Sequence, residues 1–313
     1  MISIGIKELL EMGVHFGHQT RRWNPKMKPF IFDSRNGIHI IDLSKTLAQL
    51  EAACEFLKER VGNGEHVLYV GTKKQAKEAI RERAKTCGQP YVVERWLGGT
   101  LTNMKTIKRS MGRLKEIEKM VADGTVDHFG KQEGSRLRRE LARLVKNLDG
   151  IRAMERLPGA LFVVDIRREH NAVAEARRLK IPVVAIVDTN CDPTLTDLPI
   201  AGNDDAIRSV RLILSVITQA ITQARAEYEA RYARKKAEEE SAAQATAAAP
   251  APAPAAPAPA EPLPTVAPAV PIPLVAPVPP PPPMAAPPPA PLPAPLPGPA
   301  LATAPAAAPL SGA

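Results

Sequence analysis

The chain has 313 residues and a formal net charge of +9, from 42 basic and 33 acidic side chains. It has no run of about 18 apolar residues, which argues against a membrane-spanning helix. Its first residues lack the pattern of a signal peptide. Three widely spaced cysteines, Cys54, Cys87 and Cys191, fit a reducing compartment, so we expect a cytoplasmic location.

The last part of the chain differs in composition from the rest. From Ser241 onward the sequence is mostly Ala and Pro, with 26 of the 33 prolines and only one charge, Glu261. Such a segment cannot bury enough apolar surface to offset the entropy of ordering, so 236–313 is predicted to be a disordered tail. The first 240 residues then carry 42 basic and 32 acidic side chains. This excess favours a phosphate-bearing partner, although it could serve solubility alone.

The first sixty residues are predicted to form a short helix, a basic loop, two short strands and a longer helix. These elements are expected at Ile6–Met12, 18–30, Phe30–Phe32, Ile38–Ile41 and about 43–62. Asp42 and Ser44 are the candidate N-caps of the longer helix.

From His66 onward, short apolar strands alternate with helices. The strands are expected at 66–71, 90–93, 161–165 and 182–188, and the helices at 74–85, 169–179 and about 204–231. This alternation is typical of an α/β fold with a mostly parallel sheet covered on both faces. The sheet domain is expected to comprise 1–101 and 150–235.

The interval 102–149 interrupts that alternation. Apolar residues recur there at helical spacing in two stretches joined by Asp123-Gly124: Ile107, Met111, Leu114, Ile117 and Val121, then Leu137, Leu141, Leu144 and Leu148. The spacing predicts an inserted antiparallel coiled-coil hairpin. Two ordinary surface helices are the alternative.

Nucleotide-dependent enzymes are poorly supported. Gly71-Thr72-Lys73-Lys74 follows a predicted strand but matches neither G-x-G-x-x-G nor the Walker motif. The remaining enzyme hypothesis is a small doubly wound enzyme that uses Asp165 and Asp188, which follow strands where such sheets bind ligands. No nucleophile with a partnered base is recognisable.

The same sheet edge could hold a structural divalent cation. The candidate ligands are His18, Asp188, Asp204 and Asp205, because imidazole and carboxylate groups together suit such an ion. The alternative is that Asp204 or Asp205 caps the following helix and that His15 packs beside Phe16. No firm cofactor is predicted.

Basic residues interleaved with aromatic ones indicate RNA binding. The candidates come from the loop 18–30, from the segment before Gly98-Gly99 and from the hairpin: Arg21, Arg22, Trp23, Lys26, Lys28, Arg95, Trp96, Lys105, Lys108, Arg109 and Arg113. The cations can pair with phosphates while the aromatic rings offer stacking faces to bases.

Five segments in collinear order carry a family resemblance. They are GVHFGHQTRRWNPKMKPFIF, RWLGGTLTN, PGALFVVDIRREHNAVAEARRLKIP, AIVDTNCDP and GNDDAIRS. Over roughly residues 5–230 the sequence closely resembles the family of the bacterial small-subunit ribosomal protein numbered two.

The resemblance implies a flavodoxin-like sheet with an inserted coiled-coil hairpin and no catalytic activity. It implies small-subunit ribosomal RNA and neighbouring ribosomal proteins as partners, including ribosomal protein one, whose docking the family supports. It implies neither a membrane nor a small-molecule substrate. The Pro/Ala-rich tail departs from the family pattern, so the resemblance implies nothing about its role.

Overall fold

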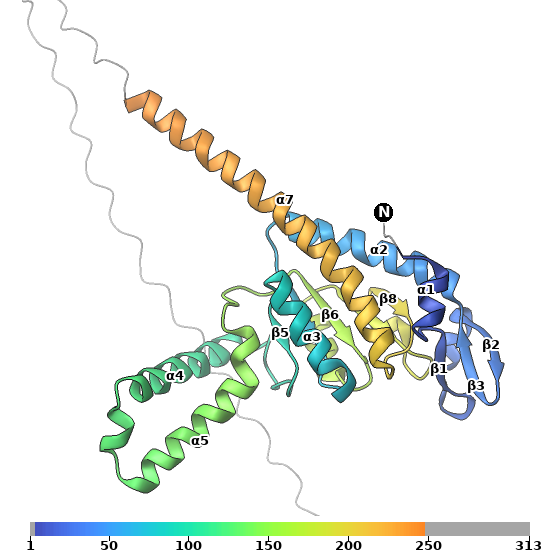
Figure 1. Cartoon of the computed structure of the whole chain (residues 1–313), viewed down its shortest axis with the longest axis horizontal. Coiled ribbons are helices and arrows are strands. Elements are labelled where there is room, and N and C mark those ends of the chain that lie inside the picture. Colours follow the sequence, from blue (N-terminus) through green and yellow to red (C-terminus); the bar gives the residue numbers. More distant parts are fainter. Residues whose placement is uncertain (1–3, 248–313) are drawn as a thin grey trace, which may run out of the picture. The chain divides into compact units, whose positions relative to one another are not determined.

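A five-stranded parallel sheet forms the centre of the computed structural model (Figure 1), which describes residues 4–247 without the side chains of residues 127, 235 and 237–247. The strands are β4 (Val67–Val70), β5 (Tyr91–Val92), β6 (Ala160–Val164), β7 (Val183–Val187) and β8 (Leu198–Ala201). Their order is β5-β4-β6-β7-β8, and every neighbouring pair is parallel. This order, 2-1-3-4-5 along the chain, is that of flavodoxin-like sheets. The predicted parallel sheet is confirmed.

Both faces of the sheet are buried. Successive residues of a strand point to opposite faces, and each set enters its own apolar cluster. Tyr69 and Phe162 enter one apolar cluster, and Leu68 and Leu161 enter the other. The first cluster includes residues of α2 (Leu43–Gly62), α3 (Lys74–Cys87) and α7 (Ile207–Ala247). The second includes residues of α6 (His170–Arg178) and of the inserted helices.

The N-terminal residues build a second, smaller sheet. After α1 (Ile6–Glu11), the strands β1 (Phe16–Gln19), β2 (Ile31–Arg35) and β3 (Ile38–Ile41) pair antiparallel in the order β1-β3-β2. The loop between β1 and β2 contains two 3-10 turns, Thr20–Arg22 and Pro25–Phe30. Asp42 caps α2 as predicted, because its carboxylate accepts the Ser44 amide at 3.0 Å.

The inserted segment consists of two helices that run back along one another (Figure 1). They are α4 (Met104–Ala122) and α5 (Lys131–Leu148), flanked by 3-10 turns at Thr125–His128 and Asp149–Ile151. Four residues of the predicted seam of α4, from Ile107 to Ile117, are buried, whereas Val121 near its end is 41% exposed. The predicted pair of helices is confirmed, and their supercoiling stays a prediction.

Helix α7 continues to Ala247, beyond the predicted end near Arg231. Residues 232–247 are rich in Ala, Glu and Lys, which favour helix without any packing. Of the predicted tail, residues 248–313 lie outside the described part of the chain. None of the helices within residues 4–247 has the length and apolar character needed to cross a bilayer.

Phe162 and Phe32 differ in burial, so they should differ in how much they contribute to the free energy of unfolding. Phe162 is fully buried, with its ring 5.5 Å from that of Tyr69, whereas Phe32 is 76% exposed. Phe162→Ala should lower the free energy of unfolding by about 3–5 kcal/mol, because it leaves a cavity in the sheet. Phe32→Ala should change it by less than about 0.5 kcal/mol. Urea-induced unfolding measures both, and equal losses would contradict the assigned core.

Candidate functional site

The carboxyl ends of the parallel strands bring four carboxylates and one lysine together. We define the carboxylate cluster as Asp165, Asp188, Asp204 and Asp205, which follow β6, β7 and β8. Lys73, the third residue after β4, places its Nζ 2.8 Å from Asp204, 2.6 Å from Asp205 and 3.4 Å from Asp165. Because these carboxylates surround the ammonium group, the pKa of Lys73 lies above its usual value, although burial opposes the shift.

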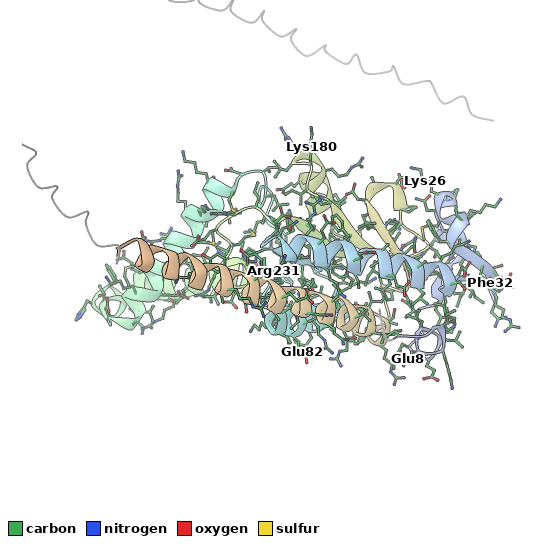
Figure 2. All side chains as sticks on the ribbon, turned by 90° about the horizontal axis from the view of Figure 1, so that it is seen from above. Glu8, Lys26, Phe32, Glu82, Lys180 and Arg231 are labelled. Atoms are coloured by element: carbon green, nitrogen blue, oxygen red, sulfur yellow. The ribbon has the colours of Figure 1, made fainter. Side chains whose placement is uncertain are left out.

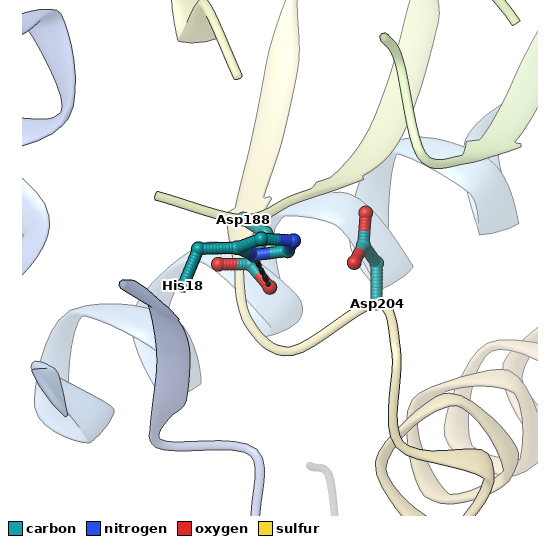
Figure 3. Close-up of side chains that lie close together, drawn as sticks. All are labelled: His18, Asp188 and Asp204. Atoms are coloured by element: carbon teal, nitrogen blue, oxygen red, sulfur yellow. Dashed lines mark ion pairs between the residues drawn. The ribbon is translucent and has the colours of Figure 1, made fainter. Parts of the chain in front are cut away.

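His18 joins the small sheet to this edge (Figure 3). Its Nδ1 lies 3.0 Å from Asp188, and its Nε2 lies 3.3 Å from Asp205. The hydrogen bond and charge of Asp188 raise the pKa of His18, with the neighbouring aspartates adding to the effect against the opposing influence of burial. The backbone amide of His18 also donates to Thr189 Oγ1 at 2.8 Å. The predicted grouping of His18 with the aspartates is therefore present in the structure.

Asp204 is fully buried, and its Oδ2 has no hydrogen-bond partner among the described residues. Burial raises the pKa of Asp204 to about 7, with the charges of Asp188 and Asp165 adding to the shift and Lys73 opposing it.

Among the described residues, no amide at the start of α7 donates to Asp204 or Asp205, contrary to the alternative considered from the sequence. Asn203 Oδ1 instead accepts the amides of Asp205 and Ala206 ahead of the helix, at 2.9 and 3.1 Å. The capping interpretation was wrong because an asparagine one position earlier makes the turn. The other packing expectation holds, since the His15 and Phe16 rings lie 4.0 Å apart.

This edge is unsuited to a nucleotide. The amide and hydroxyl of Thr72, which would face a phosphate, both donate to Glu169 Oε1. Lys73 is already held by carboxylates, and the carboxylate cluster repels anions. Asp165 and Asp188 accordingly have the surroundings of ion-paired structural groups.

The basic loop 18–30 is fixed against the connection after β7. The Asn24 amide donates to the Thr189 carbonyl at 2.8 Å, and Lys26 Nζ lies 2.6 Å from Asp192. Trp23 is half-buried, with its ring 5.2 Å from that of His39. Three other candidates of this loop remain exposed: Arg21, Arg22 and Lys28. Lys26 is thus the one candidate of this loop whose charge is partly neutralised within the described part of the chain.

Trp96 departs from the expectation of a stacking face. It is only 8% exposed, and its Nε1 donates to Glu175 Oε1 at 3.0 Å. The sequence pattern could not separate a tryptophan that packs inward from one that faces RNA. The ring of Trp96 is therefore not available as a stacking face for RNA, whereas the candidate Arg95 beside it is exposed.

Glu175 organises the glycine-rich segment that leads into the hairpin. Its carboxylate accepts hydrogen bonds from Trp96, from the amides of Gly99, Leu101 and Thr102, and from the Thr102 hydroxyl. Burial acts to raise the pKa of Glu175, but these hydrogen bonds outweigh it and hold the pKa below its usual value. Glu175 was not predicted from the sequence, and Lys73 was considered only as part of a possible phosphate motif. Its pairing with the aspartates could have been predicted, because it follows β4 by three residues at the same edge of the sheet.

The hairpin presents the remaining basic candidates on its outer surface. Lys105, Lys108 and Arg109 are exposed, and the described residues offer them no ion-pair partner. Arg113 lies 3.3 Å from Glu116 and 3.6 Å from Glu140.

Comparison with known proteins decides the family. The model of the family described as ribosomal protein S2 matches residues 9–224. The chain belongs to this family. A curated relative from Syntrophobacter fumaroxidans, named small ribosomal subunit protein uS2, is 59% identical over 225 residues, which cover 72% of this chain and 82% of that protein.

Membership in the ribosomal protein S2 family determines the class of function. The chain is a structural constituent of the small ribosomal subunit, it works in the ribosome in the cytoplasm, and it is not an enzyme. The hypothesis of a doubly wound enzyme is thereby rejected, in agreement with the acidic, internally paired sheet edge.

The Glu175 network predicts a pH-dependent contribution to stability. Glu175→Gln should destabilise the chain at pH 7 by roughly 1–3 kcal/mol, because an amide cannot accept all of these hydrogen bonds. The folded-state pKa lies below the unfolded one, so this contribution is complete above the unfolded value of about 4.3 and is lost as the pH falls through the folded-state pKa.

The measurement is urea unfolding of both chains between pH 7 and the acid limit of folding. Glu82→Gln, at an exposed position of α3, is the matched control and should change little at any pH. An equal effect of both substitutions, or a Glu175 effect that grows as the pH falls, would count against the network.

Proposed function

We propose that the chain binds small-subunit ribosomal RNA through exposed basic side chains of two segments, the loop 18–30 between β1 and β2 and the inserted hairpin 102–149, which we call the two insertions. The observation that carries this proposal is the distribution of charge. The acidic residues of the sheet edge are paired internally, whereas most basic candidates of loop 18–30 and of α4 are exposed. Exposed Lys and Arg can neutralise phosphates and release their counterions.

Two lysines of the hairpin serve as the test. The double variant Lys105→Ala and Lys108→Ala should weaken binding to small-subunit ribosomal RNA. The slope of log affinity against log salt concentration should become less steep by about 1.5, because each lost phosphate contact contributes roughly 0.7–0.9. A filter-binding series at several salt concentrations measures both quantities.

The matched control is the double variant Lys74→Ala and Lys85→Ala. These lysines are also exposed and helical, but they belong to α3, outside both insertions. The control should retain the wild-type slope. If both double variants flatten the dependence equally, binding follows net charge alone and the assigned contacts are wrong.

We further propose that the small sheet supports docking of ribosomal protein one, the partner that the family resemblance implies. Phe16 and Phe32 on this sheet are 50% and 76% exposed, and Ile38 is 37% exposed. Figure 2 shows Phe32 at the rim of the described part of the chain, pointing outward. Exposed aromatic side chains of this kind are common anchors of protein interfaces.

Phe32→Ala should weaken capture of purified ribosomal protein one by the full chain about tenfold, because an anchor of the interface is removed. Tyr232→Ala, which removes a ring that is 61% exposed on α7, is the control. Titration with the fluorescently labelled partner measures both affinities. Wild-type affinity of the Phe32 variant would exclude this sheet as the docking site.

A further inference from the structure

Helix α6 and its flanking residues expose cations without an exposed carboxylate. Glu169 and Glu175 are the acidic residues of the segment 166–180, and both are used inside the protein. Glu169 is 3% exposed and accepts the amide and the hydroxyl of Thr72. Glu175 holds the glycine-rich segment that leads into the hairpin. The charge that this part of the chain shows to solvent is therefore positive.

Four exposed side chains of this segment form what we call the α6 surface: Arg167, Arg177, Arg178 and Lys180. Within the described part of the chain, none of the four has an ion-pair partner. Arg168 is left out because its Nε donates to the Thr72 hydroxyl at 2.9 Å. These cations were not among the RNA-binding candidates of the sequence analysis, and the internal pairing of the protein does not account for them.

Lys180 occupies a backbone position that favours glycine. Helix α6 ends in a Schellman motif, in which the amides of Lys180 and Ile181 donate to the carbonyls of Arg177 and Ala176. The φ angle of Lys180 is 57°, in the left-handed region where glycine is the usual residue. The helix end alone therefore does not explain a lysine at this position, which suggests that its charge has a use of its own.

The α6 surface lies beside the hairpin. The Glu175 carboxylate accepts the amides of Gly99, Leu101 and Thr102, directly before α4 begins at Met104. Residues three apart on a helix are neighbours, so Arg178 lies one turn beyond this attachment. The cations of α6 thus continue the exposed cations at the start of α4.

One side of the molecule collects these positive charges. Figure 2 shows Lys26 and Lys180 at one side of the described part of the chain and Glu8 and Glu82 at the opposite side. Helix α6 belongs to the second apolar cluster, whereas α3 and α7 belong to the first, on the other face of the sheet. Loop 18–30 and α6 therefore show cations on the same side.

From these observations we propose that the α6 surface binds the phosphate backbone of double-stranded RNA, together with the two insertions. This inference rests on the proposed binding of RNA and adds the kind of RNA. Residues 166–182 contain no Phe, Tyr or Trp, and the nearby Trp96 is turned inward to Glu175. Cations without a large stacking ring suit the phosphates of an RNA helix better than the unstacked bases of a single strand.

The test uses the full-length chain and the triple variant Arg177→Ala, Arg178→Ala and Lys180→Gly. The probes are a plain RNA duplex and one of its separated strands, in filter-binding series at several salt concentrations. The wild type should bind the duplex more tightly than the strand, and the variant should lose most of this preference. For the duplex, the slope of log affinity against log salt should become less steep by about 2–3, because each phosphate contact contributes roughly 0.7–0.9.

The matched control removes the same charge from the other face of the sheet, through Lys74→Ala, Lys85→Ala and Arg234→Ala on α3 and α7. It should keep the wild-type slope. Equal flattening by both triple variants would show that net charge alone is at work and would overturn the inference. Equal affinity of the wild type for duplex and strand would overturn the choice of double-stranded RNA.

The single variant Lys180→Gly separates RNA binding from a role at the helix end. It should flatten the slope by about 0.9 without lowering the melting temperature, because glycine fits the backbone of this position. Cations near a helix C-terminus also stabilise the helix, so a lower melting temperature with an unchanged slope would assign Lys180 to that role instead. If Lys105→Ala with Lys108→Ala weakens binding but the α6 triple variant does not, the proposed function stands and this inference is wrong.

Discussion

The ammonium group of Lys73 connects the ends of β4, β6 and β8, and the rest of the sheet edge depends on this interaction. Three carboxylates lie within 3.4 Å of it, one of them fully buried. Without the lysine, the three would repel one another at low dielectric. In many doubly wound proteins the same edge binds ligands. In this protein Thr72 donates its hydrogen bonds to Glu169, and Lys73 is paired with the aspartates. Neither residue is therefore available to a phosphate.

Acceptors on this scaffold hold the two insertions through backbone amides and, in loop 18–30, also through the basic side chain of Lys26. Loop 18–30 is attached to Thr189 and Asp192, and the segment leading into α4 is attached to Glu175. The anchors lie at the ends of β7 and on α6, so the two insertions are fixed to the same rigid sheet. Exposed cations on anchored segments lose less conformational entropy when they bind a partner.

The sequence predicted the fold best where the hydrophobic pattern was unambiguous. Strands β4, β6 and β7 are four or five consecutive buried residues, and each was predicted within about one residue. β1 and β8 were missed because Phe16–Gln19 and Leu198–Ala201 are short, and glycine, proline or polar residues interrupt their apolar pattern.

The candidate site was predictable in its residue types but only partly in its contacts. The aspartates meet as expected, because parallel strands end at one edge, and His18 reaches them from β1 of the small sheet. The pattern could not show that Lys73 crosses this edge or that Trp96 turns inward to Glu175. Both facts depend on contacts between residues more than 75 positions apart, about which local propensity carries no information.

The acidic residues of the sheet edge and the basic candidates for RNA contact differ in burial, so salt should affect them differently. Asp188, Asp204 and Glu169 are at least 97% buried and act as internal acceptors, whereas the basic residues proposed to contact RNA are exposed. Mobile ions screen exposed charges strongly and buried pairs weakly. Rising ionic strength should therefore weaken the proposed association with RNA while the sheet edge keeps its geometry. The interactions that shape this scaffold therefore differ from those proposed to bind RNA.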